Sequence, residues 1–204
     1  MLQENCYIIN DETNECVIID CGAYSDAERK DIVEYIFTNN LKPVHLIATH
    51  GHLDHNFGND TIYEKFKLNP EISESDMHLM DISSKQAESF FGIKLEYDLP
   101  KPKVRLNGND TIKYGNKHLK VLETPGHSFG SISLYDEYNH LLFTGDTLFK
   151  NSIGRTDLES GNMLQIIQSL RMLAQLPDET KVYPGHGPMT TIGEELANNP
   201  YMDR

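Results

Sequence analysis

The chain has 204 residues, which is enough for one domain with a large buried core and too few for two full domains. We therefore expect a single domain over residues 1–204. Its 31 acidic and 18 basic residues give a formal net charge of −13, which argues against nucleic acid and against an anionic membrane surface as partners.

The first half of the chain alternates strand and helix patterns. Residues 6–10 and 16–20 flank a polar turn, which predicts a β-hairpin. Ser25-Asp26-Ala27-Glu28 has the pattern of a capping box and opens a predicted helix. The apolar face of this helix is predicted to consist of Ile32, Val33, Ile36 and Phe37. A buried strand at 44–48 and helices at 55–68 and 83–91 follow.

The second half begins with strand patterns and ends with a helix and a short strand. Strands are predicted at residues 103–106, 111–114, 118–122, 131–135 and 140–144. Residues 162–176 predict an amphipathic helix, followed by a last strand at 181–183. The apolar side of that helix is predicted to carry Met163, Ile166, Ile167, Leu170, Leu173 and Leu176. This order of elements indicates a mixed α/β class.

Cysteine usage and the first residues indicate a cytoplasmic location. Cys6, Cys16 and Cys21 are odd in number and close together, and we interpret them as reduced thiols. No apolar run approaches the roughly 18 residues of a membrane span. The N-terminus lacks the basic region and the apolar core of a signal peptide.

Residues 49–55, with the sequence T-H-G-H-L-D-H, form the motif that is most informative about function. They follow the predicted strand at 44–48, so His50, His52, Asp54 and His55 can be directed at one point. Imidazole suits Zn²⁺ or Fe, and a carboxylate adds an oxygen ligand. Four such side chains are too many for one tetrahedral ion with an open position. The motif therefore predicts a two-metal site, or one metal with a second site beside it.

Three more residues of ligand type stand at predicted strand ends. His127 follows the strand at 118–122, Asp146 ends the run Leu141–Gly145, and His186 lies in Pro184-Gly185-His186-Gly187. Glycine lets the backbone approach closely at such turns. Structural zinc sites are closed and rich in cysteine, and none of the three cysteines belongs to this set. The other histidines, His45, His78, His118 and His140, are expected to be structural or solvated.

The combined pattern H-x-H-x-D-H, G-H, G-D and P-G-H-G resembles the metallo-β-lactamase superfamily, specifically its glyoxalase II-like branch, from Asn5 to Pro200. The resemblance implies an αββα sandwich, with two face-to-face sheets, outer helices and metals at one edge. It also implies a first metal site of His50, His52 and His127, a second of Asp54, His55 and His186, and Asp146 as the bridge. Asp20 matches the family's D-x-G and would orient the metal-binding loop. We expect two divalent ions, Zn²⁺ by preference, although the same ligands accept Fe or Mn²⁺.

The function that this resemblance implies is metal-dependent hydrolysis of an activated acyl bond by a bridging, metal-bound hydroxide. Asp54 would accept the proton. The expected substrate is a small-molecule thioester such as S-lactoylglutathione, which glyoxalase II hydrolyses to D-lactate and glutathione. The sequence does not indicate an oligomeric state.

The chain departs from full-length glyoxalase II at its ends and in one loop. It ends at Arg204, so we expect no C-terminal helical region with basic residues for glutathione, and it starts so late that the family's first strand is expected to be missing or shortened. Gly154-Arg155-Thr156-Asp157 stands where the full-length enzyme has a glutathione-binding G-K-x-Y segment. Arg155 is therefore the candidate substrate-binding residue, with a structural salt bridge to Asp157 as the alternative. The chain resembles the short bacterial glyoxalase II-like hydrolases more closely.

A second function remains open. The G-R-T-D segment also occurs in the persulfide dioxygenase branch, which would use one iron on His50, His127 and Asp146 to oxidise glutathione persulfide. That branch has alanine before the final histidine, whereas Gly185 precedes His186 here, so we favour the hydrolase. A non-catalytic metal-binding module is a third possibility, and we place β-lactamase, lactonase and RNA-processing activities behind the hydrolase.

Overall fold

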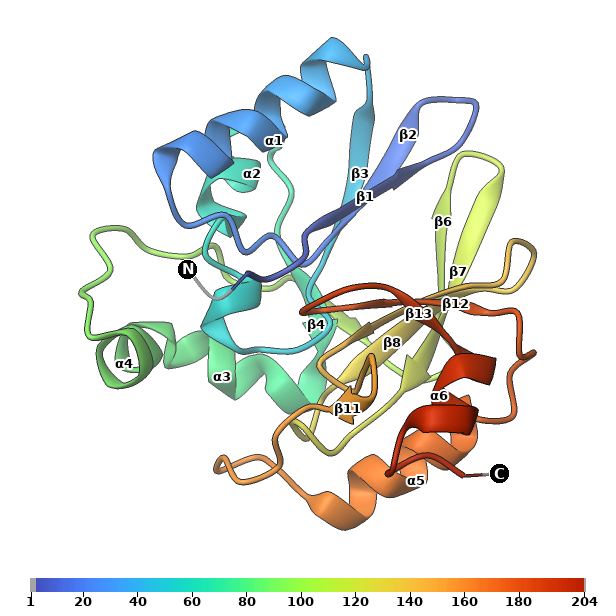
Figure 1. Cartoon of the computed structure of the whole chain (residues 1–204). Helices are drawn as coiled ribbons and strands as arrows, with labels where there is room; N and C mark the ends of the chain where they lie inside the picture. Colours follow the sequence, from blue (N-terminus) through green and yellow to red (C-terminus); the bar gives the residue numbers. More distant parts are fainter. Residues whose placement is uncertain (1–2, 204) are drawn as a thin grey trace.

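Two β-sheets face each other in the computed structural model, which describes residues 3–203 (Figure 1). The first sheet has five strands in the order β1-β2-β3-β4-β5, and the second has six in the order β13-β12-β9-β8-β7-β6. The strands of the first sheet are β1 (Tyr7–Asn10), β2 (Glu15–Ile19), β3 (Lys42–Ile47), β4 (Glu71–Ser73) and β5 (Val104–Leu106). Those of the second are β6 (Thr111–Tyr114), β7 (Lys117–Glu123), β8 (Ile132–Asp136), β9 (Leu141–Gly145), β12 (Lys181–Pro184) and β13 (Thr190–Thr191). A separate two-stranded ribbon joins β10 (Leu148–Phe149) and β11 (Ser152–Ile153).

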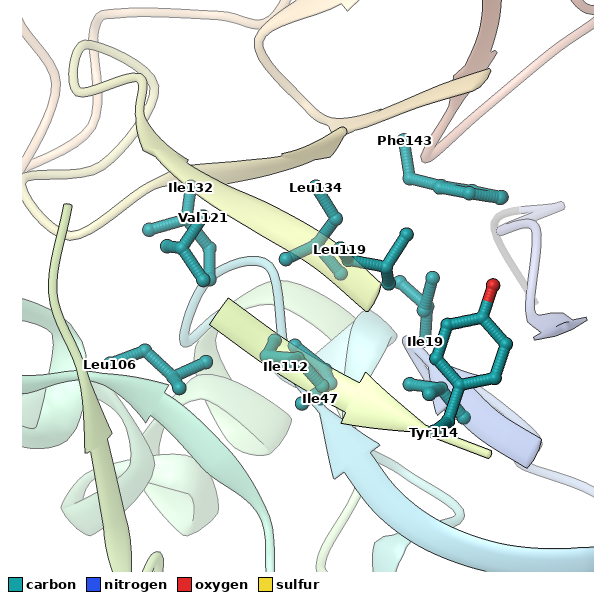
Figure 2. Close-up of a cluster of buried hydrophobic side chains, with 11 residues drawn as sticks. Ile19, Ile47, Leu106, Ile112, Tyr114, Leu119, Val121, Ile132, Leu134 and Phe143 are labelled. Atoms are coloured by element: carbon teal, nitrogen blue, oxygen red, sulfur yellow. The ribbon is translucent and has the colours of Figure 1, made fainter. Parts of the chain in front are cut away.

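The period-two alternation of the strands divides their side chains between two apolar layers. Ile19 of β2 points into the space between the sheets, where it packs with residues of the second sheet such as Leu119 and Leu134 (Figure 2). Val17, two residues before it, belongs to the same cluster. Ile18, between them in sequence, belongs instead to a cluster under the outer helices. Because Cys16–Ile19 of β2 are buried on both faces of the strand, these four residues form a continuous apolar run.

Helices cover the outer face of each sheet (Figure 1). α1 (Asp26–Thr38) and α2 (Asn59–Phe66) bury Ile36 and Ile62 against the first sheet. α5 (Met163–Leu173) and α6 (Ile192–Asn198) bury residues such as Leu170 and Ile192 against the second. α3 (Met77–Asp81) and α4 (Ser83–Gln86) lie near the edge where the 49–55 loop runs. The predicted αββα sandwich is therefore confirmed.

Several local predictions need correction. The predicted helix at 55–68 begins only at Asn59, because residues Leu53–His55 form a single 3₁₀ turn within the 49–55 loop. The predicted helix at 83–91 changes from α4 to a π-helical turn at Ala87–Phe91. The sequence places Phe37 on the buried face of α1, but Phe37 is 62% exposed, and its ring lies against Phe66 with ring centroids 5.7 Å apart.

The capping predictions agree with the structure. Ser25 and Glu28 form the reciprocal capping box of α1, with the side chain of each bound to the backbone N–H of the other. In α5, the predicted apolar positions Ile166, Leu170 and Leu173 are buried, but Met163 at its first turn is half-exposed.

Among the described residues, no helix combines the length and apolarity needed to cross a bilayer.

Candidate metal centre

Five strands end at one edge of the sandwich, and each delivers polar side chains there. β2 ends before Asp20, β3 before the 49–55 loop, β7 before the turn of His127, β9 before Asp146, and β12 before His186. β2 and β3 are parallel, and so are β9 and β12, while β7 is antiparallel to β8, which is antiparallel to β9. The carboxyl ends of strands within each sheet therefore point the same way, which gathers residues that are distant in sequence.

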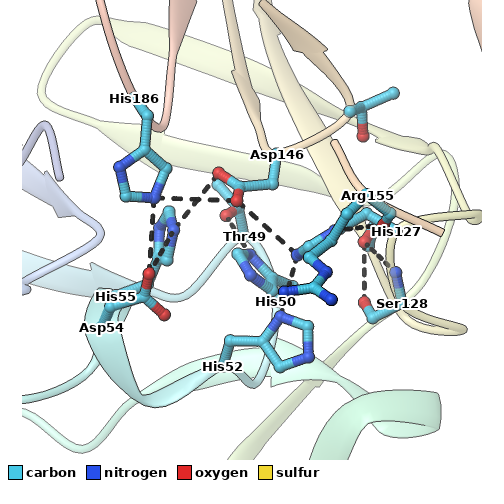
Figure 3. Close-up of polar contacts among 12 residues, drawn as sticks. Thr49, His50, His52, Asp54, His55, His127, Ser128, Asp146, Arg155 and His186 are labelled. Atoms are coloured by element: carbon cyan, nitrogen blue, oxygen red, sulfur yellow. Dashed lines mark hydrogen bonds and ion pairs between the residues drawn. The ribbon is translucent and has the colours of Figure 1, made fainter. Parts of the chain in front are cut away.

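Three histidines form the first group of this cluster. One ligand-type atom of each of His50, His52 and His127 lies within 4.8 Å of the others, and all three side chains are buried. His52 Nδ1 is 2.8 Å from His127 Nε2 (Figure 3). Three converging imidazoles are a typical set of protein ligands for a transition-metal ion that keeps another coordination position open.

Asp54, His55 and His186 form the second group, with ligand-type atoms again within 4.8 Å of one another. His186 Nε2 is 3.4 Å from Asp54 Oδ2. Asp146 lies between the two groups: its Oδ1 is 3.3 Å from His55 Nε2, and its Oδ2 is 3.6 Å from His127 Nε2 (Figure 3). One carboxylate thus reaches histidines of both groups.

Buried polar atoms without partners mark the centre of this cluster. Among the described residues, His50 Nε2, His55 Nε2 and Asp146 Oδ1 are inaccessible to solvent and accept or donate no hydrogen bond. Buried polar atoms are costly when unsatisfied, by about 1–3 kcal/mol each. Divalent cations coordinated by these atoms would remove that cost. The donor set of five imidazoles and two carboxylates fits two such ions.

Two histidines of the first group, His50 and His52, are in the protonation state that binds a metal ion. Burial, together with neighbouring histidines, lowers the pKa of His50 well below its usual value. Burial and His127 lower the pKa of His52 to about 4. Both rings are therefore neutral at neutral pH, and a neutral imidazole is the form that binds a metal.

The carboxylates of Asp54, in the second group, and of Asp146, between the groups, are both ionised. Burial by itself would raise the pKa of Asp54, but His55 and His186 outweigh it and lower that pKa below its usual value. The pKa of Asp146 is likewise lowered by His55, against the effect of burial. Two anionic ligands offset part of the charge of two cations.

Asp20 connects the end of β2 to the 49–55 loop. Its Oδ1 accepts the backbone N–H of Thr49 at 2.7 Å, and its Oδ2 accepts the Thr49 hydroxyl at 2.8 Å. Oδ2 also lies 3.0 Å from Nδ1 of His55. When His55 donates its Nδ1 proton to Asp20, its Nε2 carries a lone pair directed at the cluster. This is the geometry that an orienting role requires.

Two buried residues that the sequence analysis missed hold the ligand loops. Asp76 accepts hydrogen bonds from Gly51 N–H at 2.9 Å, the Ser128 hydroxyl at 2.6 Å and Gly130 N–H at 2.6 Å. It therefore ties the loop of His50 and His52 to the loop of His127. The approach is so close that a Cβ on Gly51 would lie 2.8 Å from the Asp76 carbonyl oxygen.

Gln86 also holds the loop of His50 and His52, and Asn5 holds the turn that carries His186 in the second group. Gln86 Oε1 accepts the Leu53 N–H at 3.0 Å, while its Nε2 donates to the carbonyl of Gly51 at 3.1 Å. The Asn5 side chain donates to the carbonyls of Pro184 at 3.1 Å and Gly187 at 2.8 Å, on either side of His186. Neither residue belongs to a motif of ligand-type side chains, so the sequence carried no signal for these contacts.

Arg155 contacts the site through its backbone and forms an ion pair through its side chain. Its backbone carbonyl is 2.8 Å from Nδ1 of His127 and orients that ring. Its side chain forms a two-point ion pair with Asp157, Nε to Oδ1 and Nη2 to Oδ2, both at 2.7 Å. The salt bridge that the sequence left as an alternative is thus present, at an exposed position.

A cavity of about 470 Å³ opens onto the cluster. Candidate ligands from both groups form its floor, and Gln86 and Arg155 contribute polar atoms. The remaining lining is apolar and consists of Phe90, Phe91, Phe149 and Leu158. A concave site of this size accommodates a small molecule beside the ligand cluster.

The other histidines and the cysteines lie outside the cluster. His45 contacts Glu71 at 2.6 Å, His78 the carbonyl of Ser75 at 3.0 Å, and His140 the Tyr135 hydroxyl at 3.2 Å. The three cysteines are free thiols. None of these residues belongs to the seven-residue set.

Residues 1–186 match the family model described as the metallo-beta-lactamase superfamily. An uncharacterized protein of Aquifex aeolicus is 38% identical, over 97% of this chain and 90% of its own. The probable metallo-hydrolase YqgX of Bacillus subtilis is 35% identical, over 99% and 93%. Hydroxyacylglutathione hydrolase GloC of Haemophilus influenzae is 34% identical, over 98% and 93%.

Three solved structures have the same fold. BLEG-1 B3 metallo-beta-lactamase has a TM-score of 0.89 and 32% identity, covering 98% of this chain and 95% of its own. TTHA1623 in a di-iron-bound form has a TM-score of 0.85 and 33% identity, covering 98% and 96%. ETHE1 from Myxococcus xanthus has a TM-score of 0.79 and 30% identity, covering 98% and 79%.

Proposed function

The chain belongs to the metallo-β-lactamase superfamily, and we propose that it is a hydrolase of thioesters that works with two divalent cations. The observation that carries this proposal is the convergence of seven ligand-type side chains whose central atoms, His50 Nε2, His55 Nε2 and Asp146 Oδ1, lack hydrogen-bond partners in the described structure. A purely structural polar cluster would satisfy such atoms internally.

We assign the ligands by the two groups. His50, His52 and His127 would hold one cation, and Asp54, His55 and His186 the other, with Asp146 shared between them. When bound, the two cations would lower the pKa of water towards neutrality and polarise a carbonyl. Zn²⁺ suits this donor set, and Fe or Mn²⁺ suit it as well, as the di-iron form of TTHA1623 illustrates for a relative.

The residues of the chain supply the remaining chemistry. Asp54 lines the cavity, and its ionised carboxylate can accept the proton of the attacking water and pass it to the leaving thiolate. Water adds to the acyl carbon, the carbon–sulfur bond breaks, and the thiol leaves with the proton. Asp20 and Asp76 keep the ligand loops in place during these steps. The thioester assignment is supported by the relative named hydroxyacylglutathione hydrolase.

The second candidate is the persulfide dioxygenase. It is favoured by the Gly154-Arg155-Thr156-Asp157 segment and by the presence of His50, His127 and Asp146, which that branch would use for one iron. His55 and His186 would have no ligand role in that case. Both rings lie beside Asp146, and His55 is fully buried with its Nε2 lacking a hydrogen-bond partner in the described structure, which favours the two-cation hydrolase.

One panel of assays separates these functions. Protein purified without added metal is analysed for metal content and then assayed for thioester hydrolysis, oxygen consumption with glutathione persulfide, and β-lactam hydrolysis. Thioester hydrolysis with two ions per chain supports the proposal. Persulfide-dependent oxygen consumption with one iron per chain, and no thioester hydrolysis, would replace it by the dioxygenase.

A further inference from the structure

The cavity over the metal centre has one apolar wall that the proposed reaction does not use. Phe90 and Phe91 come from the π-helical turn that follows α4, Phe149 from β10, and Leu158 from the loop before α5. These side chains face the same space as His52, Asp54 and Asp146. A substrate whose acyl carbon lies at the cluster would therefore place part of its structure against this wall.

Two of these rings are held in place before any substrate binds. Phe91 packs edge-on against Phe57, with ring centroids 5.3 Å apart, and Phe57 in turn packs against Tyr24 at 5.0 Å. Phe149 packs edge-on against His186 at 6.1 Å. Phe90 is 55% exposed beside them. A preformed aromatic wall with an exposed ring at its rim is suited to bind an apolar group, because little ordering is needed on binding.

Charge in the cavity disfavours an anionic substrate end. Among the described residues that line it, Arg155 is the only lysine or arginine. Its Nε and Nη2 both donate to the Asp157 carboxylate, whose pKa this contact lowers to about 2, so the pair carries no net charge over the physiological range. The chain as a whole carries a formal charge of −13. A thiol with free carboxylates would find no unpaired cation here other than the metal ions.

We propose that the preferred substrates are thioesters with an extended apolar or aromatic acyl group, bound against Phe90, Phe91, Phe149 and Leu158, and that the thiol half needs no charge. This inference rests on the proposed thioester hydrolase activity and narrows it. It places glutathione among the tolerated thiols and assigns selectivity to the acyl side.

A matched set of thioesters tests the inference on the metal-loaded full chain. Acetyl, butanoyl, hexanoyl and benzoyl groups are each attached to N-acetylcysteamine, a neutral thiol, and to glutathione. Each buried methylene is expected to raise kcat/KM by about threefold to fourfold, so hexanoyl should exceed acetyl by at least about tenfold even with partial burial. The two thiols should differ by less than about threefold for the same acyl group.

Single substitutions test whether the apolar wall causes the dependence of kcat/KM on acyl length. Phe90→Ala and Leu158→Ala should each lower the hexanoyl-to-acetyl ratio of kcat/KM by about threefold or more. Phe37→Ala is the matched control, because Phe37 is as exposed as Phe90 but lies on α1 outside the cavity, and it should keep the parent ratio. Asp157→Asn should free Arg155 and raise kcat/KM for glutathione thioesters relative to neutral ones. Asp203→Asn, which unpairs the exposed Arg171 instead, should leave that preference unchanged.

The outcomes are distinguishable. A flat dependence on acyl length, or a preference above about tenfold for glutathione thioesters in the parent protein, overturns the inference while leaving thioester hydrolysis intact. An unchanged hexanoyl-to-acetyl ratio in both wall variants overturns it as well. If the protein with two bound ions hydrolyses none of the thioesters, the proposed function itself fails and this inference falls with it.

Discussion

The carboxylate of Asp20 lies 3.0 Å from Nδ1 of His55, and this contact determines which nitrogen of His55 faces the ligand cluster. Asp20 occupies a left-handed backbone conformation with φ of 52°, which aspartate adopts more readily than most residues. The same side chain receives two hydrogen bonds from Thr49, so the end of β2 fixes the start of the loop that follows β3.

Asp20→Asn should weaken metal binding at the second group. The amide can accept one hydrogen bond from Thr49, but its NH₂ would face the Nδ1 proton of His55 and destabilise the tautomer that ligates. We expect a loss of about 10-fold to 100-fold in affinity for the second ion, measured by competition with a chelator. Asp136→Asn is the control, since Asp136 is a similarly buried carboxylate that binds turn residues away from the cluster. Equal loss of affinity in both variants would contradict the orienting role.

Asp76→Asn should destabilise the fold and weaken the first group. Asp76 is fully buried and accepts from three donors, so one amide N–H would oppose another donor. We expect a loss of about 2–4 kcal/mol in the free energy of unfolding of the metal-free protein, measured by urea denaturation. First-ion affinity should fall too. Unchanged affinity for both ions would show that Asp76 serves the fold alone.

The contacts of His45 should make the free energy of unfolding depend on pH. Its Nδ1 is 2.6 Å from Glu71 and its Nε2 is 3.0 Å from the carbonyl of Lys113, so both nitrogens face acceptors and the charged ring is favoured. The hydrogen bond with Glu71, opposed by burial, raises the pKa of His45 above its usual value. Because the folded-state pKa is the raised one, this stabilisation is complete below about pH 6.5 and is lost as the pH rises through the folded-state pKa.

His45→Gln should therefore cost more stability at pH 6 than at pH 9. The quantity to compare is the difference in unfolding free energy between parent and variant at each pH, because titration of the ligand histidines is common to both proteins and cancels. A difference that grows with pH would contradict the assignment.

Asp146→Asn should remove metal and activity together. The carboxylate lies between the two groups and would offset the repulsion between two close cations, whereas an amide keeps the shape and loses the charge. We expect at least one ion to be lost per chain and hydrolysis to fall by at least about 100-fold. Circular dichroism should be unchanged, because the core lies between the sheets. A fully active variant that retains both ions would refute the role of Asp146 as the bridge.

The residues of the candidate site could be predicted because each signal is local in sequence. The four ligand-type residues at 50–55 and the strand-end positions of His127, Asp146 and His186 are visible in short segments. The strand β2 could be predicted as well, since its residues 16–19 are buried on both faces and are all apolar.

The supporting residues could not be predicted for the opposite reason. Asp76 contacts Gly51 and Gly130, which are 25 and 54 positions away, and nothing near Asp76 in the sequence indicates those partners. Residues 71–91 form a three-residue strand, a 3₁₀ turn, two short helices and a π-helical turn, so no periodic pattern develops. The exposure of Phe37 could not be predicted either. The buried face of α1 is centred on Ile36 and does not extend to Phe37, although the apolar residues of the helix predict a wider buried face.

Metal stoichiometry, measured alongside thioester hydrolysis, tests the two-cation account most directly. Protein freed of metal is titrated with Zn²⁺, and bound metal and activity are followed in the same samples. The account predicts saturation at about two ions per chain, with hydrolysis developing as the second ion binds, and loss of that second ion in His55→Ala and His186→Ala. Saturation at one ion, with both variants retaining parental metal content and activity, would contradict it.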